Sequence, residues 1–258
     1  MWTSLPRTDS SGGATLVRRQ GIERAASVNF RDLFYYFFNV RVFLETLPDL
    51  LQGLLVTVEI AFLSLCLGFV LGLVLAVLRV AVKRRSNPLI IRLLNLPIAL
   101  YVDVLRSIPP LVILIVVYYA LPYIGLVIPR FWAAVLTFVV ILSAFTEEIF
   151  RAGIESIDRG QIEAARSLGL SYITTMTYVV IPQAFRVALP PMTSRMIAIT
   201  KDVSLASVIG VADVLKKARA AQAFLANPTP LFSAALLFTI LFLPLVRISM
   251  YLEKRLAK

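Results

Sequence analysis

One long apolar run limits what this chain can fold into. Between Asp49 and Arg79 the only charged residue is Glu59. A helix needs about 20 apolar residues to cross the hydrocarbon core of a bilayer, so this run is long enough to span it. Hydrophobic residues make up 59% of the chain, whereas soluble domains contain about 45–50%. The sequence therefore predicts an all-α integral membrane protein.

Four further stretches are expected to cross the membrane, namely residues 107–121, 131–150, 187–212 and 231–248. The stretch 87–110, broken by prolines, is mixed in polarity, and we expect it to form an interfacial elbow that leads into the second span. The stretch 187–212 carries several charges, which are costly in lipid unless they face a cavity or neighbouring helices. We therefore expect this helix inside the assembly, in a bundle of about five transmembrane helices.

Composition divides the chain into three parts. Residues 1–29 are polar and lack the apolar core of a signal peptide, so we expect a flexible tail. Residues 30–49 mix aromatic and charged side chains, a composition typical of a segment in the membrane interface. Residues 50–258 hold the predicted transmembrane domain.

The distribution of basic residues predicts the orientation of the bundle. Lysine and arginine cluster after the first span and near the C-terminus, whereas the loops expected on the other side hold few. The positive-inside rule then places the C-terminus in the cytoplasm and, with five spans, the N-terminus outside. Because the net charge of +11 comes largely from residues that flank apolar runs, no nucleic-acid partner is expected.

Residue types argue against catalysis. The chain has no histidine, and its single cysteine is Cys66, so the commonest general base and metal ligand is missing. No catalytic residue and no metal site are expected. Glu147 and Glu148 form a carboxylate pair, an arrangement used in acid–base chemistry. Their place at the inner end of the third span favours salt bridges to Arg151 or Arg159 instead.

A polar stretch in the middle of the chain predicts a compact helical hairpin. Asp158 is a suitable N-cap, and Gln161 three residues later makes a capping-box-like pair. Gly169 is placed to end the first helix in the left-handed conformation. Ser171 is placed to cap a second helix, and Pro182 lies where that helix should stop or bend.

The motif spacing of this hairpin resembles the EAA loop of permease subunits of ATP-binding cassette importers. Glu163-Ala164-Ala165 is followed by Gly169 and then by Val179-Val180-Ile181-Pro182, where the family pattern has Ile and Leu in place of Val179 and Ile181. Flanking stretches such as LRSIPPLVILIVVYYALP and KDVSLASVIGV are similar to the polar amino acid branch of that family. The resemblance covers about residues 50–255.

The resemblance implies transport without covalent chemistry. The loop, about residues 155–185, would lie in the cytoplasm and dock into a dimer of ATP-binding subunits, which would hold ATP and Mg and hydrolyse the nucleotide. This chain has no G-x-x-x-x-G-K-[ST] phosphate loop and would carry no cofactor of its own. The residues expected to couple it to the ATPase are Glu163, Ala164, Ala165, Gly169 and Pro182.

Further partners and a location follow from the same resemblance. A second permease subunit, identical or similar, would complete the translocation path. An extracytoplasmic amino-acid-binding protein would deliver the substrate. The chain would be a multi-pass protein of the bacterial plasma (inner) membrane, surrounded by lipid.

Charged residues within the predicted spans are candidates for the translocation path. Lys201 and Asp202 would meet the carboxylate and ammonium of an amino acid, or would form a structural ion pair. Glu59 would face the cavity or lie at the membrane edge. Arg195 would bind the substrate carboxylate or, as we favour, pair with a carboxylate on another helix. Hydroxyls that would line the path or join helices belong to Ser204 and Ser207.

Two other functions compete with import. An intramembrane enzyme would use Glu147 and Glu148, but no nucleophile–base motif accompanies them. An ion-coupled secondary carrier would work alone, and we detect no inverted repeat of the kind that builds such carriers. The two transport mechanisms differ in their requirements, because a carrier needs an ion gradient, whereas an importer subunit needs ATP, its ATPase and a binding protein.

Overall fold

The structure, a computed structural model, describes residues 36–82 and 88–256, and within these ranges every regular element is helical. The tail at residues 1–29 and the start of the segment 30–49 lie outside the described residues. The predicted all-α class is confirmed for the described chain. The long helices are α3 (Val40–Val82), α4 (Pro88–Ser107), α6 (Arg130–Glu155), α9 (Ile181–Asp202) and α11 (Thr229–Leu256). The shorter elements are α5 (Pro110–Ala120), η1 (Leu121–Ile124), α7 (Arg159–Ser167), α8 (Tyr172–Thr175), the π-helical turn η2 (Met176–Val180), η3 (Val203–Ile209) and α10 (Val214–Leu225).

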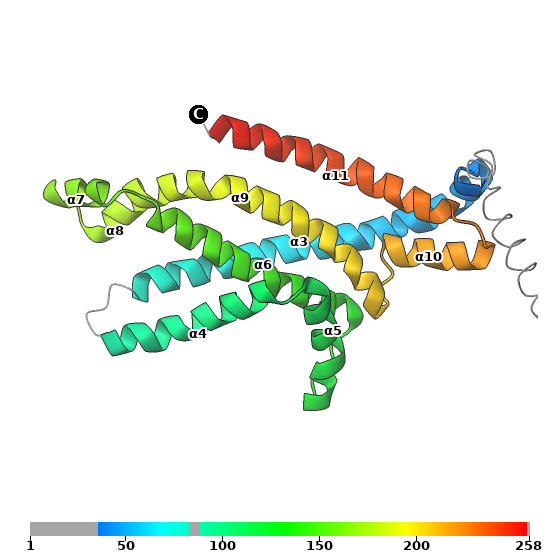
Figure 1. Ribbon diagram of the computed structural model, residues 1–258, viewed down its shortest axis with the longest axis horizontal. Coiled ribbons are helices and arrows are strands. Elements are labelled where there is room, and N and C mark those ends of the chain that lie inside the picture. Colours follow the sequence, from blue (N-terminus) through cyan, green and yellow to red (C-terminus); the bar gives the residue numbers. More distant parts are fainter. Residues whose placement is uncertain (1–35, 83–87, 257–258) are drawn as a thin grey trace, which may run out of the picture.

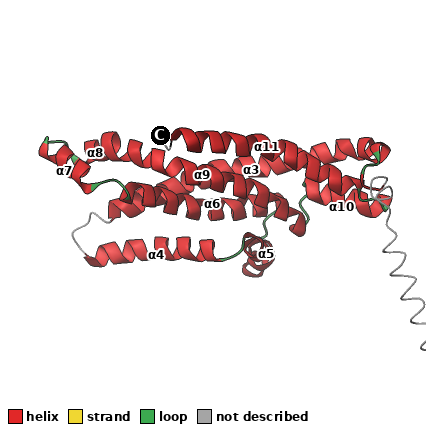
Figure 2. Cartoon of the chain, turned by 45° about the horizontal axis from the view of Figure 1, so that its top comes forward, coloured by secondary structure: helices red, strands yellow, loops and turns green. Residues whose placement is uncertain are grey.

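The long helices lie side by side along one axis (Figure 1). Along this axis α3, α6 and α11 run in one direction, and α4 and α9 run in the opposite direction. The short helices α7 and α8 lie at one end of the bundle, and α10 lies at the other end. Figure 2 shows the same separation of the two ends from a second direction.

Close packing of α3 against α6 builds the centre of the bundle. Two glycines of α3 face α6, as their four-residue spacing predicts. A Cβ added at Gly72 would lie 2.5 Å from the carbonyl oxygen of Ser143, and one added at Gly68 would lie 2.9 Å from Cβ of Leu142. The two helices therefore approach each other closely at these glycines.

The apolar core lies between α3, α6 and α9. Phe138 and Leu142 of α6 are fully buried, in one cluster with Ile60 of α3 and Ile199 of α9. In the most apolar window of each helix, 72% of the α6 residues are buried but only 17% of the α11 residues. Therefore α6 is the central helix, and α11 lies at the edge of the bundle.

The elbow predicted before the second span is present as a sharp bend. The chain bends by 108° between residues Ile91–Ser107 of α4 and the segment Pro110–Ile124, which comprises α5 and η1. The 20 residues of α4 extend about 30 Å, and they run alongside α6 (Figure 1). The 11 residues of α5 extend about 16 Å, less than the thickness of a hydrocarbon core. α5 alone therefore does not make a complete crossing, and the second span at residues 107–121 stays a prediction.

Pro109 and Pro110 explain this bend. Proline lacks the backbone N–H that continues a helix, and it disfavours helical geometry in the residue before it. α4 therefore ends at Ser107, and α5 starts afresh at Pro110. Hydropathy predicts the second span at α5 because α5 is more apolar than α4. α4 tolerates its polar residues because one face packs against α6.

α9 packs within the bundle, although it is not apolar enough to count as a membrane span by hydropathy. Among the described residues, three helices are long and apolar enough to cross a membrane, or four if α4 and α5 count as one broken span. α9, which carries Arg195, Lys201 and Asp202, is not among them. It nevertheless packs against α6, α11 and α3. Lys201 is exposed within one chain, so the position of this charged helix inside the assembly stays a prediction.

Candidate functional site

The predicted hairpin forms at one end of the bundle from α7, α8 and η2. Oδ1 of Asp158 accepts a hydrogen bond from the N–H of Gly160 at 2.7 Å and caps α7. Gly169 follows that helix with a φ of +78°, a conformation that glycine adopts at least cost. Oγ of Ser171 accepts from the N–H of Thr174 at 3.2 Å and caps α8. Both caps and the left-handed glycine are confirmed.

Two details of the hairpin differ from the prediction. The side chain of Gln161 turns toward α9, where its Oε1 accepts a hydrogen bond from Nε2 of Gln183 at 2.6 Å, instead of capping α7. Pro182 does not end a helix. It lies in the first turn of α9, directly after the π-helical turn η2, where the helix changes its hydrogen-bond pattern.

The surface of the hairpin is largely open. Glu163 and Ala164 are exposed, whereas Ala165 is buried between α7 and the rest of the hairpin. Apolar side chains also face outward, although the hairpin is polar in composition, and patches of this kind mark interaction sites. The most exposed of them are Leu168 at 81%, Tyr178 at 77% and Ile173 at 76%.

The base of the hairpin is tied to two long helices. The hydrogen bond between Gln161 and Gln183 joins α7 to α9. Gly153 of α6 lies so close to α9 that an added Cβ would be 2.9 Å from the carbonyl oxygen of Ala184. The hairpin is thus bonded to α9, and α9 is close-packed on α6, so a displacement of the hairpin acts on both helices.

A charged cluster joins α3, α4 and α6 near the same end. Glu147 is fully buried, and Nη1 of Arg79 donates to its two carboxylate oxygens at 3.0 and 3.1 Å. Nε of Arg151 lies 3.6 Å from Oε1 of Glu147. Glu148 pairs with Arg151 and lies 3.6 Å from Nη1 of Arg106. The expected bridge to Arg151 is confirmed, whereas Arg79 and Arg106 were not foreseen, because contacts between helices leave no local sequence spacing.

Arg195 of α9 contacts an aromatic ring. Its guanidinium carbon lies 3.4 Å from the centroid of the Phe145 ring, and Arg106 approaches the same ring at 5.4 Å. Nε of Arg195 is buried, and it has no hydrogen-bond partner among the described residues. A buried guanidinium N–H of this kind is available to an anion.

The other predicted path residues surround the end of α9. Nζ of the exposed Lys201 lies 6.0 Å from the centroid of the Phe242 ring in α11, and Asp202 is half-buried. Oγ of Ser204 donates to the carbonyl oxygen of Lys201 at 2.8 Å. Ser207 is buried, and its Oγ has no partner among the described residues.

Glu59 lies apart from this group. It is exposed on a face of α3 that also carries Leu55 and Phe62, which are 64% and 65% exposed. Within one chain, the structure does not bring Glu59 together with Arg195.

Comparison with protein families gives one matching family model. Residues 68–258 match the binding-protein-dependent transport system inner membrane component. The chain is 41% identical over 175 residues to the probable glutamine ABC transporter permease protein GlnP of Bacillus subtilis (strain 168), which covers 68% of this chain and 77% of that protein. It is 37% identical over 213 residues to the arginine transport system permease protein ArtQ of the same organism, which covers 81% of this chain and 93% of that protein.

Solved structures show the same fold. A chain of the crystal structure of an amino acid ABC transporter with histidines superposes with a TM-score of 0.71 at 31% identity, covering 89% of this chain and 99% of that one. A chain of the inward-facing MetNI methionine ABC transporter superposes with a TM-score of 0.65 at 22% identity, covering 81% of this chain and 97% of that one. The second likeness is one of fold alone.

Proposed function

The chain belongs to the family of binding-protein-dependent transport system inner membrane components, and from this premise we propose that it forms the translocation path of an ATP-driven amino acid importer. As a permease component of the inner membrane it crosses the bilayer several times and is not itself an enzyme. The observation that carries the proposal is the hairpin with EAA spacing, which is capped, exposed and tied to α6 and α9 at one end of a membrane bundle.

The proposed importer contains several subunits. A dimer of cytoplasmic ATP-binding subunits binds ATP with Mg and hydrolyses the nucleotide. A second permease subunit, identical or similar, completes the path, and an extracytoplasmic binding protein delivers the substrate. Two relatives are named for glutamine and arginine, which supports an amino acid as substrate.

We propose that α3, α4, α6, α9 and α11 are the membrane passes of the domain formed by residues 50–258. Their alternating directions (Figure 1) place the start of α3 and the C-terminus on opposite sides. α4 and α9, with 20 and 22 residues, are about 30 and 33 Å long, which matches the hydrocarbon core. With the C-terminus inside, the hairpin faces the cytoplasm.

Coupling then follows from the exposed tip and the fixed base of the hairpin. Glu163 and Ala164 face outward on α7, and Leu168 adds an apolar contact. An ATPase surface that closes on this tip would shift α7, and the base contacts would move α6 and α9, the helix that bears Arg195. In this way nucleotide-driven closure changes the path without any chemistry in this chain.

The test is Gly169→Asp. A Cβ at Gly169 would meet no atom within 4 Å, so the left-handed φ is the main source of strain for the new residue. We expect loss of ATPase co-purification and of transport, with membrane insertion retained and with no greater loss of thermal stability than in a control that carries the same strain. Gly125→Asp is the matched control, because Gly125 also has a left-handed φ, +85°, and equally open surroundings, but lies in the loop between α5 and α6.

Normal assembly and transport by Gly169→Asp would contradict the coupling assignment. So would an equal loss in Gly125→Asp, because that loss would come from backbone strain and not from the contact with the partner.

For the path, the unpaired Nε of Arg195 supports a contact with the substrate carboxylate. Lys201, Asp202, Ser204 and Ser207 extend the same polar stretch of α9 and η3. Glu59 joins the path where the second permease subunit covers the exposed face of α3.

Arg195→Gln should lower the kcat/KM for import by roughly tenfold to a hundredfold, since a hydrogen bond to a charged group is lost. Arg195→Lys keeps the positive charge, so its kcat/KM for import should fall less than that of Arg195→Gln. Equal kcat/KM in wild type and Arg195→Gln would remove Arg195 from the path.

A further inference from the structure

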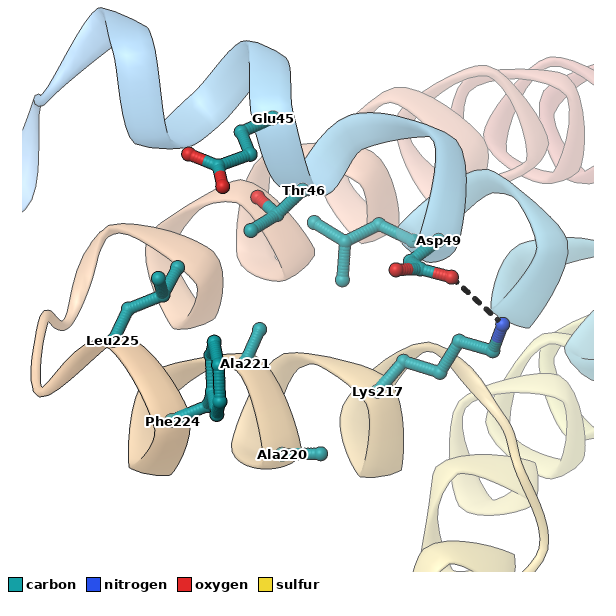
Figure 3. Close-up of a pocket in the computed structure, with 9 residues that line it drawn as sticks. Glu45, Thr46, Asp49, Lys217, Ala220, Ala221, Phe224 and Leu225 are labelled. Atoms are coloured by element: carbon teal, nitrogen blue, oxygen red, sulfur yellow. Dashed lines mark hydrogen bonds and ion pairs between the residues drawn. The ribbon is translucent and has the colours of Figure 1, made fainter.

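At the end of the bundle opposite the hairpin, α10 and the first turns of α3 enclose a hollow of about 440 Å³ (Figure 3). Its lining is mostly apolar, with small alanines on the α10 side. Three charged side chains lie around its opening, and the apolar side chains lie between them. The charged residues are Glu45, Asp49 and Lys217, and the apolar ones include Leu50, Ala221 and Leu225.

The hollow opens outside the hydrocarbon core. The 43 residues of α3 extend about 64 Å, roughly twice the thickness of that core. The long apolar run of α3 begins only after Asp49, so the turns that carry Glu45 and Asp49 project beyond the lipid chains. α10 carries Lys216 and Arg219, both exposed. The walls of the hollow are therefore in contact with water.

A phenylalanine stands uncovered at this opening. Phe224 is 89% exposed, and its ring projects from α10 toward α3 (Figure 3). An aromatic side chain in water forgoes the free energy of burial. A large apolar anchor beside a pocket with a polar rim is the usual centre of a protein–protein interface.

Both walls of the hollow are held together before any partner arrives. Nζ of Lys217 lies 3.3 Å from Oδ1 of Asp49 and donates to Oε1 of Gln52 at 2.9 Å. At Gly53 of α3 an added Cβ would lie 2.8 Å from the backbone N of Val214, so α10 packs directly on the α3 backbone. A preorganised surface of this kind loses little entropy on binding.

We infer that Phe224 and the hollow form the docking site for the extracytoplasmic binding protein, an inference that rests on the proposed function. The occupant is a surface loop of that protein. It inserts an apolar side chain beside Phe224, presents a basic side chain to Glu45 at the rim, and offers a carboxylate to Lys216 and Arg219 on the neighbouring face of α10. The charged rim and the basic face of α10 favour such a loop over lipid chains, which offer neither charge nor hydrogen bonds.

The experiment measures binding by the assembled importer, reconstituted in nanodiscs with its ATPase and its binding protein. Phe224→Ala should weaken the Kd for the binding protein about tenfold or more and reduce the stimulation of ATPase activity by that protein. Ala221→Trp, which fills the hollow but keeps Phe224, should weaken binding as well. Phe62→Ala is the matched control, because Phe62 is also an exposed phenylalanine but lies on α3, within its apolar run.

A second measurement locates Phe224 directly. Phe224→Trp in a background where Trp2 and Trp132 are replaced by Phe leaves a single tryptophan in this chain. We expect quenching by acrylamide in water that decreases when the binding protein is added. Quenching by brominated lipid, unchanged by the binding protein, would show that the bilayer covers Phe224 and would overturn the inference.

The experiment distinguishes a wrong docking site from a wrong proposed function. If the binding protein stimulates wild type and Phe224→Ala equally, with equal Kd, docking lies elsewhere, and the importer function stands. If no binding protein stimulates even the wild-type complex, the proposed function itself falls, and the docking site falls with it.

Discussion

Asp213 lies in the turn between η3 and α10 and is fully buried. Its Oδ1 accepts a hydrogen bond from the N–H of Lys216 at 2.8 Å and caps α10, while Oδ2 has no partner among the described residues. Burial raises the pKa of Asp213 from 3.8 to about 6, although the Lys216 N–H opposes this shift. The folded chain therefore keeps this proton at pH values where the unfolded chain has lost it.

The sign of the resulting pH effect follows by linkage. Between about pH 4 and pH 6 the unfolded state binds fewer protons at this site, so the Asp213 contribution to stability falls as the pH rises. Asp213→Asn keeps the cap and removes the titration. Between about pH 4.5 and pH 7, the free energy of unfolding of wild type should fall by on the order of 2 kcal/mol more than that of Asp213→Asn. Thermal unfolding in detergent measures this difference.

Asp158→Asn serves as the control for this prediction, because it makes the same change at an exposed N-cap. If wild type and Asp213→Asn show the same pH dependence, burial does not hold the proton on Asp213.

At this scale the sequence predicts local features and misses distant ones. The caps at Asp158 and Ser171 and the turn at Gly169 depend on neighbours within a few residues, so their residue types suffice. The bond between Arg79 and Glu147 joins residues 68 positions apart, and nothing in the local pattern signals it. The ring contact between Arg195 and Phe145 is missed for the same reason.

Among the elements, the contact between α3 and α6 depends most on a single small residue. Gly72→Ala would place a Cβ against the backbone of Ser143 and Cβ of Thr146. Backbone atoms cannot yield as a flexible side chain can, so the helices must separate. We expect a loss of about 1–3 kcal/mol in stability, seen as a lower melting temperature in detergent.

Gly160→Ala is the comparison for this change. In α7 the added Cβ would meet only the side chain of Asp158, at 3.3 Å, so the melting temperature should change little. If both variants melt alike, the Gly72 contact does not limit the approach of α3 and α6.

The helices themselves were largely predictable, because hydropathy and the polar hairpin mark their limits. The directions of α4 and α5 at the elbow could not be predicted in this way. Residues 107–121 are the more apolar arm, yet the proline pair turns α5 across the bundle, and the more polar α4 runs beside α6. Hydropathy reports the preference of a segment for lipid but not its direction, which packing sets.

For the whole molecule, the proposed orientation places the two ends of the bundle on opposite sides of the membrane. The sole cysteine is Cys66, so a Cys66→Ser background accepts single labels. An impermeant maleimide should modify Phe224→Cys in intact cells and Ile173→Cys only in inside-out vesicles. Both target positions are largely exposed, at 89% and 76%.

Labelling of both positions after permeabilisation shows that each thiol is reactive. Modification of Ile173→Cys in intact cells would place the hairpin outside, where no cytoplasmic ATPase reaches it.

The unbroken length of α3 has a mechanical consequence. The same helix carries Asp49 beside the outer hollow and Arg79 in the charged cluster near the hairpin. Asp49 and Arg79 are 30 residues apart, a rise of about 45 Å, and a tilt of about 5° around the middle of this stretch moves its two ends by roughly 2 Å in opposite directions. A lateral push on one side of the bilayer thus arrives on the other side as an opposite displacement of similar size, with no relay of intermediate contacts.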